Sequence, residues 1–374
     1  MSLLWYGIQG EGRGHAARSG VLIERLRDLG HEVRIFTGGD AEAMFADDPH
    51  RERIPLLRFA YFKGRLSLLR SILRNAPLAT QLMTRTGPVI GTLCRRARRE
   101  KPDLILTDFE PFLSRVGQRT GIPVVCIDHQ HALSDTQLPA LGRAGDDLSG
   151  RILSKGVPLI SHSPHRIVSS FAHFPLRPGS EARLVGCFLR RKVLELLADP
   201  PRRPGGHVTV YVKEAALLDR ILPVLRKRPE RFEIWSSDTR REDVENLSFH
   251  GLHADRFLES LASCRWLLST AGNQGLGEAL AFAKPVLAIP VPGQTEQEYN
   301  ALALVRSGCG STVPLEEFEV SSIASFVADL PAHHAAVEER RRSSPEMIDG
   351  TEAGLRLVLE VLERSRAEGL RLAA

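Results

Sequence analysis

The chain has 374 residues and an ordinary globular composition, 43% hydrophobic and 25% charged, which is long enough for two domains. No apolar run reaches the roughly 18 residues of a membrane span, and the start lacks the basic flank and cleavage site of a signal peptide. Five widely spaced cysteines without a CxxC pair argue against a disulfide framework or a zinc site, so we expect a protein of the reducing cytoplasm, with a net charge of +5.

The first elements predict a strand and a helix joined by a loop rich in glycine. Residues 3–8, LLWYGI, are an apolar strand, and the stretch GIQGEGRGHAARSG follows at 7–20. Apolar residues then recur at helical spacing over 17–29, and 31–37 alternates like a second strand. This order predicts a ligand site, because backbone N–H groups at a helix start attract anions.

Short apolar runs alternate with helical patterns along the rest of the chain, which is typical of parallel sheets in α/β proteins. We expect these further strands in two series: 103–107, 123–127, 158–162 and 182–186, then 207–212, 232–237, 246–251, 266–270 and 285–291.

The stretch between the two series, ADPPRRPGG, is rich in proline, glycine and arginine, which is typical of a linker. The pattern predicts two Rossmann-like, doubly wound α/β domains over 1–190 and 207–345, joined by a linker over 191–206. Leucines at helical spacing over 346–374 predict a C-terminal helix that docks back on the first domain.

The glycine loop has two competing interpretations. Gly12, Gly14 and Ala17 match the lenient dinucleotide fingerprint G-x-G-x-x-A, with Asp40 as the acid that would bind a ribose. His15 argues against this, because it lies at the helix start, where the positive helix end favours a neutral imidazole that can act as a base. The alternative for this histidine is a hydrogen bond to a nearby backbone group.

The stretch 269–304, STAGNQGLGEALAFAKPVLAIPVPGQTEQEYNALAL, repeats the order of strand, glycine turn and helix. Its turn offers backbone donors for a phosphate, and Glu278 falls in the first turn of the helix, where it can accept hydrogen bonds from a ribose diol. The next strand ends at PVPGQTEQ, which places Gln294, Glu296 and Gln297 at its carboxyl end, the usual position of ligand contacts in such sheets. Polar side chains there suit sugar hydroxyls.

The two motifs, GxGRGHxxRS and GxxxxxEALxxxKPVLxIPxxGQxEQxxNA, together resemble GT-B glycosyltransferases. The similarity is to bacterial and archaeal relatives of UDP-glucuronosyltransferases and of the peptidoglycan N-acetylglucosaminyltransferase, and it covers both halves of the chain. It implies two Rossmann-like domains that face each other across a cleft, with a hydroxyl acceptor on the first and a nucleotide sugar, expected to be a UDP-sugar, on the second. It also implies inversion at the anomeric carbon, with no metal and no further cofactor.

The resemblance assigns roles to single residues. His15 matches the histidine that serves as catalytic base in plant and animal relatives, and Asp108 matches the aspartate that orients it, a pairing that suits proton removal from an attacking hydroxyl. Glu278 matches the acid that binds the donor ribose. Glu296 and Gln297 match the pair that holds the donor sugar, although many relatives have aspartate at the first position. The alternatives are a helix cap for Asp108 and surface helix positions for the three donor residues.

A departing diphosphate needs positive charge or N–H donors. The sequence has no D-x-D motif at a strand end, the pattern that would indicate a metal site. Arg190 resembles an arginine that contacts donor phosphate in some relatives, the alternative being a charge of the linker. Lys213 lies where relatives often have a phosphate loop rich in glycine and serine, so it would substitute for that loop. Together with Glu278, Glu296 and Gln297, the residues expected to bind the donor are Gly12, Gly14, Arg190, Lys213, Gly272, Asn273, Gln274 and Gly275.

Residues 51–101 are strongly basic, with Leu, Ile and Phe between the charges and only two acids, Glu52 and Glu100. The first 187 residues accordingly carry 26 Lys and Arg against 18 Asp and Glu, and the rest carry 24 against 27. The pattern predicts peripheral contact with an anionic membrane or a pocket for an acidic acceptor, the alternative being solvated helix faces. Because it has neither a recognition motif nor regularly placed aromatics, we expect no nucleic-acid partner.

Three other functions compete with sugar transfer. A UDP-N-acetylglucosamine 2-epimerase shares the fold, but such enzymes have several acidic catalytic residues in the first domain, and GQTEQEYN favours transfer. A non-catalytic protein that binds a nucleotide sugar or a lipid needs neither His15 nor Asp108. A nicotinamide-dependent oxidoreductase rests on the weak glycine fingerprint alone.

Overall fold

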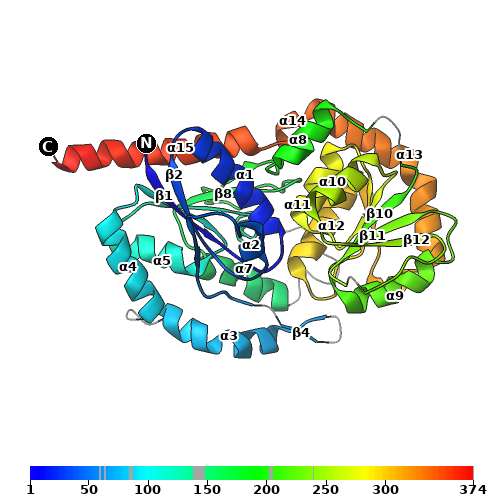
Figure 1. The fold of residues 1–374 in the computed structure, drawn as a ribbon, viewed down its shortest axis with the longest axis horizontal. Coiled ribbons are helices and arrows are strands. Elements are labelled where there is room, and N and C mark those ends of the chain that lie inside the picture. The colour runs from blue at the N-terminus through cyan, green and yellow to red at the C-terminus, as the bar shows by residue number, and fades with distance from the viewer. Residues whose placement is uncertain are drawn as a thin grey trace.

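The computed structural model describes residues 1–58, 60–62, 65–83, 87–137, 148–201, 205–238 and 240–373. Two parallel sheets lie side by side, each with helices packed on it, and the C-terminal helix runs along the first sheet (Figure 1). Parallel strands need crossover connections, which the helices between successive strands supply.

The first sheet has seven strands in the order β3-β2-β1-β6-β7-β8-β9. They are β1 (Leu3–Ile8), β2 (Glu32–Thr37), β3 (Arg51–Arg53), β6 (Leu104–Asp108), β7 (Val124–Asp128), β8 (His165–Ser169) and β9 (Arg183–Val185). The strand order reverses between β1 and β6, and ligands bind such sheets at the carboxyl ends of the strands beside this switch point.

The second sheet has six strands in the order β12-β11-β10-β13-β14-β15, and its order reverses between β10 and β13. They are β10 (Val208–Tyr211), β11 (Phe232–Ser236), β12 (Leu247–Gly251), β13 (Leu267–Ser269), β14 (Val286–Ala288) and β15 (Gly310–Thr312). A separate antiparallel pair joins β4 (Tyr61–Phe62) to β5 (Arg65–Leu66).

Helices connect the strands and cover the sheets. They are α1 (Gly14–Asp28), α2 (Gly39–Met44), α3 (Leu68–Met83), α4 (Pro88–Glu100), α5 (Pro111–Thr120), α6 (His131–Asp135), α7 (Leu148–Ile160), α8 (Arg191–Ala198), α9 (Ala215–Leu225), α10 (Ala254–Ser263), α11 (Asn273–Ala281), α12 (Thr295–Arg306), the 3₁₀ turn η1 (Leu315–Glu317), α13 (Val320–Ser343), α14 (Pro345–Ile348) and α15 (Thr351–Ala373).

An apolar core joins the two halves of the molecule. Phe171 and Phe174, after β8, are buried with Leu276 of α11 and Tyr299 of α12. The rings of Phe174 and Tyr299 meet edge to face, with centroids 5.0 Å apart. Burial of several aromatic rings in one cluster holds the carboxyl edges of the two sheets close to each other.

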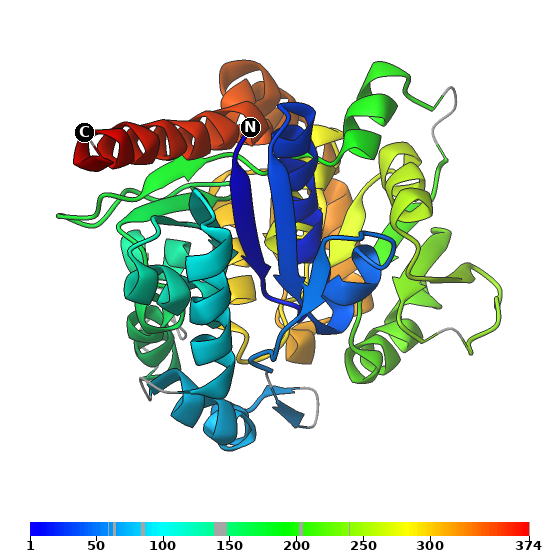
Figure 2. The ribbon, with the colours of Figure 1, turned by 60° about the vertical axis from the view of Figure 1, so that its left-hand side comes forward.

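The C-terminal helix docks on the first sheet, as the sequence predicts. Leu355, Val358 and Leu362 of α15 are buried in the core that also contains Leu4 of β1. Arg366 Nη2 donates a 2.6 Å hydrogen bond to the Met1 carbonyl, so both ends of the chain lie on the same side of the molecule (Figure 2).

The predicted strand at 158–162 is wrong. Most of this run belongs to α7, with Pro158 inside the helix, and β8 (His165–Ser169) is the next strand instead. A short apolar run does not by itself distinguish a buried strand from a buried helix, which explains the error. In the predicted linker, 191–198 is α8 and 202–204 lies outside the described residues, so the domain boundaries stay predictions.

Candidate active site

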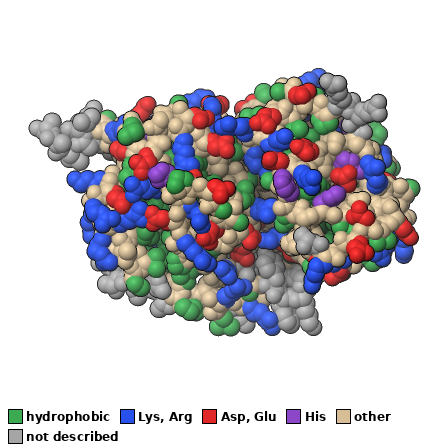
Figure 3. Space-filling view, in the orientation of Figure 1, with side chains coloured by type: hydrophobic (Ala, Val, Ile, Leu, Met, Phe, Trp, Pro, Cys, Tyr) green, Lys and Arg blue, Asp and Glu red, His purple; other side chains and the backbone are tan. Residues whose placement is uncertain are grey.

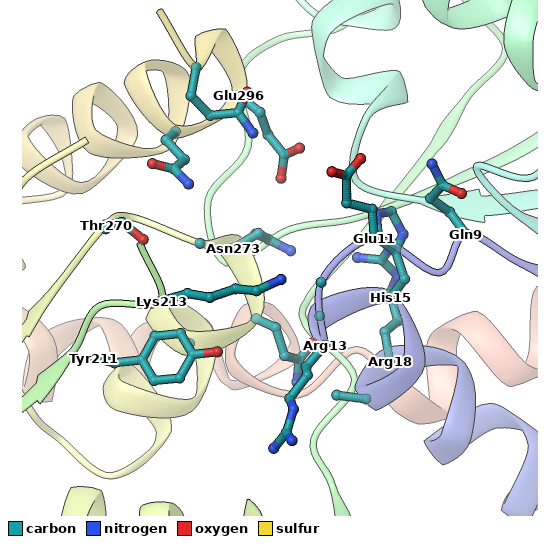
Figure 4. A pocket seen from close by; sticks show the side chains of 18 of the residues that line it. Gln9, Glu11, Arg13, His15, Arg18, Tyr211, Lys213, Thr270, Asn273 and Glu296 are labelled. Atoms are coloured by element: carbon teal, nitrogen blue, oxygen red, sulfur yellow. The ribbon is translucent and has the colours of Figure 1, made fainter. Parts of the chain in front are cut away.

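A cavity of about 590 Å³ lies between the carboxyl edges of the two sheets. The loop after β1 and the start of α1 line it on one side, and the turn before α11 and the start of α12 line it on the other. Figure 4 shows Glu11 and His15 facing Lys213, Tyr211 and Glu296 across this space. Both switch points therefore open into one cavity.

His15 and Asp108 meet at the first switch point. His15 is the second residue of α1, and Asp108 is the last residue of β6, where it pairs in register with Ile8 of β1. The distance from His15 Nδ1 to Asp108 Oδ1 is 2.6 Å, and the carboxylate is fully buried. A carboxylate only accepts, so Nδ1 donates, and in the neutral imidazole Nε2 keeps its lone pair. The alternative of a helix cap for Asp108 is wrong, because Glu110 caps α5.

Arg18 is a third member of this cluster that the sequence analysis did not assign. Its Nε and Nη2 donate to Asp108 Oδ2 and Oδ1 at 3.0 and 2.5 Å, and Ser19 Oγ donates to Oδ2 at 3.0 Å. Burial alone would raise the pKa of Asp108, but Arg18 and His15 outweigh it and hold that pKa below its usual value. The spacing from His15 to Arg18 could have predicted the contact of Arg18 with Asp108, because residues three apart share a helix face and His15 was already paired with Asp108.

Two residues beside the site have a left-handed backbone. Phe109, after Asp108, has a φ of 53°, and Ala271, before the turn into α11, has a φ of 61°. The Phe109 ring lies parallel to the His15 imidazole, with centroids 6.5 Å apart. Such strain costs on the order of 1–3 kcal/mol per residue and tends to occur at functional sites, so its presence at both switch points supports a site there.

The turn into α11 supplies donors at the second switch point. Gly272 is the N-cap of α11, and the first N–H groups of a helix have no partner within it. The side chains that follow reach to the first half of the chain: Asn273 Nδ2 donates to the Ser169 carbonyl at 3.1 Å, and Gln274 Nε2 donates to the Phe188 carbonyl at 2.9 Å. The structure thus uses these two side chains to join the halves, and the backbone of the turn lines the cavity with Gly275.

Glu278 and Arg190 form an ion pair inside the cavity wall. Arg190 Nε and Nη2 each donate to one oxygen of Glu278 at 2.7 Å, and Gln274 Nε2 donates to Oε1 at 2.9 Å. The expectations of a first-turn and of a surface position for Glu278 are both wrong, because it lies in the second turn of α11 and its side chain is 1% exposed. The sequence predicts separate ligand contacts for Glu278 and Arg190, whereas the structure pairs the two side chains.

Lys213 reaches across the cavity to the first half of the chain. Its Nζ lies 2.6 Å from Asp40 Oδ2, which also accepts a 3.1 Å hydrogen bond from the N–H of Gly12. Burial alone would lower the pKa of Lys213, but the hydrogen bond to Asp40 and the negative charge of Asp40, with smaller contributions from Tyr211 and Glu214, together raise that pKa. Gly12 has a φ of 85°, which glycine adopts without strain, and Gly14 lines the cavity beside it.

Glu296 and Gln297 lie in the first turn of α12, after β14. Gln297 Oε1 accepts a 2.8 Å hydrogen bond from the Val291 N–H, and Glu296 Oε2 accepts one of 2.9 Å from Gln130 Nε2. The same Gln130 nitrogen lies 3.4 Å from His15 Nε2. Gln130 was not predicted as a site residue, although it lies two residues after β7, beside β6, where a parallel sheet contacts its ligands.

Among the residues that the structure describes, no three His, Cys, Asp or Glu side chains are grouped so that they could hold a metal ion. Within the same residues, no helix has the length and apolar character to cross a membrane.

The model of glycosyl transferase family 1 matches residues 2–331. The chain belongs to this family. A UDP-N-acetylglucosamine–N-acetylmuramyl-(pentapeptide) pyrophosphoryl-undecaprenol N-acetylglucosamine transferase from Methylorubrum extorquens is 24% identical over 346 residues, 85% of this chain and 86% of the relative. An uncharacterised glycosyltransferase from Methanosarcina acetivorans is 25% identical over 394 residues, 97% of this chain and 96% of the relative. The protein is therefore a glycosyltransferase.

Solved structures confirm the GT-B fold of this glycosyltransferase. Arabidopsis thaliana UGT89C1 in complex with UDP superposes with a TM-score of 0.67 at 14% identity, over 98% of this chain and 100% of that one. Acinetobacter baumannii MurG superposes with a TM-score of 0.59 at 12% identity, over 96% and 100%. The expectation of two Rossmann-like domains facing across a cleft is correct.

Proposed function

We propose that this glycosyltransferase moves a sugar from a UDP-sugar to a hydroxyl acceptor, with inversion at the anomeric carbon. The observation that carries the proposal is that His15, bonded to the buried Asp108, lines one side of the cavity and Glu296 lines the other, while Gln130 contacts both. A uridine donor is supported by the Methylorubrum extorquens relative, whose name includes UDP-N-acetylglucosamine, and by the UDP in the Arabidopsis thaliana structure.

His15 is the proposed general base. Its Nε2 takes the proton of the acceptor hydroxyl while that oxygen forms a bond to the anomeric carbon. The bond from this carbon to the phosphate oxygen breaks, and its electron pair leaves with the diphosphate. Asp108 stabilises the imidazolium, so that the pair contributes about 100- to 10,000-fold to the rate. Attack opposite the leaving group in one displacement inverts the anomeric carbon.

The departing diphosphate carries negative charge, which the donor side can stabilise with cations and N–H groups. The start of α11 from Gly272 to Gly275 offers backbone donors at a positive helix end. Lys213 and Arg190 add positive charge on the same side of the cavity. We propose that these groups act in place of a divalent cation, and turnover in excess EDTA should then equal turnover without it. Activity that EDTA abolishes and magnesium restores would contradict this part.

Donor and stereochemistry are tested together. A thermal-shift panel of UDP, dTDP, UDP-glucose, UDP-N-acetylglucosamine and UDP-glucuronic acid selects the donor, because a ligand at 100 times its dissociation constant stabilises the native state by about 2.7 kcal/mol. Transfer from the selected α-linked donor to a panel of hydroxyl compounds is then followed by NMR. A β-linked product is expected, and an α-linked product would contradict inversion.

We also propose that the protein works in the cytoplasm, peripherally on the inner membrane face. The name of the Methylorubrum extorquens relative includes pyrophosphoryl-undecaprenol, a lipid carrier. Exposed bases gather on and beside α4, where Figure 3 shows Lys and Arg at the left edge of the first half. Within 51–101, Arg96 is instead structural, bonded to Glu52 and Glu100. The exposed bases of this region are Arg53, Arg58, Arg70, Arg74, Arg95, Arg98, Arg99 and Lys101, and Lys63 and Arg85 lie outside the described residues.

A vesicle sedimentation assay tests the membrane contact. Replacing Arg95, Arg98 and Arg99 of α4 by alanine should weaken binding to anionic vesicles about 100-fold, since each base near such a surface contributes about 1 kcal/mol. The matched control replaces three exposed bases on and after α9, namely Arg220, Arg226 and Lys227, and should leave vesicle binding unchanged. Equal losses in the two triple variants would contradict a contact through α4.

A further inference from the structure

Gln130 is the side chain that connects the two sides of the cavity. It lies between β7 and α6, lines the cavity and is 8% exposed. Its Nε2 donates to Glu296 Oε2 at 2.9 Å and lies 3.4 Å from His15 Nε2. One amide group thus touches both the base and the residue that the proposed function places on the donor sugar.

The chemistry of these two neighbours fixes the orientation of the amide. The carboxylate of Glu296 only accepts hydrogen bonds, so the amide must turn its NH₂ group toward it. In the neutral imidazole, which a general base requires, His15 Nε2 is also an acceptor, because Nδ1 carries the proton that is donated to Asp108. Both neighbours therefore select the same orientation, and Oε1 is the atom of Gln130 that is left for another partner.

Gln130 Oε1 is buried and accepts no hydrogen bond from the residues that the structure describes. A buried amide oxygen without a donor is unfavourable and uncommon in folded proteins. The side chain lines the cavity, so a substrate bound there lies next to this amide. The unpartnered oxygen thus points to a ligand contact at this position.

We propose that Gln130 binds the transferred sugar, with Oε1 accepting a hydrogen bond from a sugar hydroxyl while the NH₂ group keeps Glu296 next to His15. The reacting hydroxyl of the acceptor does not supply this bond, because it has one proton and His15 takes it. A sugar held at Glu296 lies beside the same amide and has other hydroxyls to offer. This inference rests on the proposed function and adds the residue that brings sugar and base together.

Calorimetric binding of UDP and of the UDP-sugar selected above tests the contact. Gln130→Met removes both hydrogen-bonding groups at similar length, so the UDP-sugar should bind about three- to tenfold more weakly, the effect of one or two neutral hydrogen bonds. UDP lacks the transferred sugar, so its dissociation constant for the variant should lie within about twofold of the wild-type value. The matched control is Gln137→Met, an exposed glutamine bonded to the Leu176 carbonyl outside the cavity, which should change neither constant.

Donor analogues that lack single sugar hydroxyls give a second measurement that needs no folded variant. In the wild-type protein, one analogue should lose the same three- to tenfold in affinity. If Gln130→Met folds, it should bind this analogue and the natural donor equally, because the contact is already gone. Gln130→Asn, which draws the amide back by one methylene, should also weaken the UDP-sugar and spare UDP.

The outcomes separate this inference from the proposed function. Equal weakening of UDP and UDP-sugar in Gln130→Met, or no change in either, would overturn the contact while donor binding by the wild type still stands. So would an analogue series in which no single hydroxyl matters. A wild-type protein that binds none of the nucleotide sugars would instead overturn the proposed function.

Discussion

The two switch points that form the cavity differ in how they hold their charges. At the first, each oxygen of Asp108 accepts two hydrogen bonds, and all the donors come from His15, Arg18 and Ser19 of one helix, α1. At the second, the partners come from the opposite side of the cavity, as in the pair of Lys213 with Asp40.

The other contacts of the second switch point follow the same rule. Arg190, which follows the first sheet in sequence, binds Glu278 of α11, and Gln130 binds Glu296 of α12. The charged side chains around Asp108 are fully positioned without a ligand. The charged and polar side chains of the second switch point instead bond to residues on the other side of the cavity. We infer that the first switch point is built for chemistry and that a ligand competes for the contacts of the second.

The buried cluster should be the more costly of the two to break. Arg18→Met leaves Asp108 buried without its cation and should lower the free energy of unfolding by about 3–5 kcal/mol. Adding Asp108→Asn removes the unpaired charge and should restore much of the loss. As a matched control, Arg191→Met breaks an exposed pair with Glu24 and should cost under about 1 kcal/mol in urea unfolding. Equal losses of unfolding free energy for Arg18→Met and Arg191→Met would contradict the prediction that the buried cluster is the more costly to break.

Donor binding should separate the residues of the second switch point. Glu278→Gln should weaken UDP and UDP-sugar alike, by about 0.5–3 kcal/mol, because the predicted contact is to the nucleotide. Gln297→Ala should weaken only the sugar-bearing ligand, because its predicted contact is to the sugar. Titration calorimetry with both ligands measures this difference, and identical patterns for the two variants would show that the roles are assigned wrongly.

Acid unfolding distinguishes Asp108 of the first switch point from Asp40, the carboxylate that pairs across the cavity with Lys213 of the second. The pKa values of Asp108 and Asp40 are both held below the usual value against the opposing effect of burial, by Arg18 and His15 in one case and by Lys213 in the other. A depressed pKa gives stability that is present above about pH 4 and is lost as the pH falls through the folded value. Asp108→Asn should therefore flatten the decline of unfolding free energy below pH 4 more than Asp40→Asn. A larger flattening by Asp40→Asn than by Asp108→Asn would contradict the prediction that Asp108 has the stronger stabilising contacts.

The smallest effect on stability is expected from the pair across the cavity. Lys213→Met breaks a partly exposed contact with Asp40 and should change the free energy of unfolding by about 0.2–1 kcal/mol. The pair should also weaken in salt, so the difference from wild type should shrink at 1 M NaCl. Urea unfolding at two salt concentrations measures it. A loss as large as that of Arg18→Met would show that the second switch point is equally rigid.

The sequence predicted most of the fold because buried strands and glycine turns have strong local patterns. The strands at 3–8 and 207–212 were found within one residue at each end. The strand β3, Arg51–Arg53, is three polar residues long and has no apolar pattern to detect. Its pairing with β2 is set by the tertiary structure, which local sequence does not contain.

For the site, the sequence predicted the residues that line the cavity more accurately than it predicted the contacts between those residues. His15 and Asp108 were paired correctly because the resemblance supplied both positions. Arg190 and Glu278 were not paired, since their 88 residues of separation hide the contact until the chain is folded. Gln130 has no motif of its own, and only its place beside the switch point shows what it touches.

The most direct test of His15 as a base oriented by Asp108 is the turnover of His15→Ala. It is measured together with donor affinity, and also in the double variant with Asp108→Asn. Loss of the base should lower turnover by about 100- to 10,000-fold with the dissociation constant of the UDP-sugar within about twofold of wild type, and the double variant should be hardly worse. His162→Ala, an exposed histidine outside the cavity, is the control and should leave both quantities unchanged. Near-native turnover of His15→Ala, or losses that add fully in the double variant, would contradict a base oriented by Asp108.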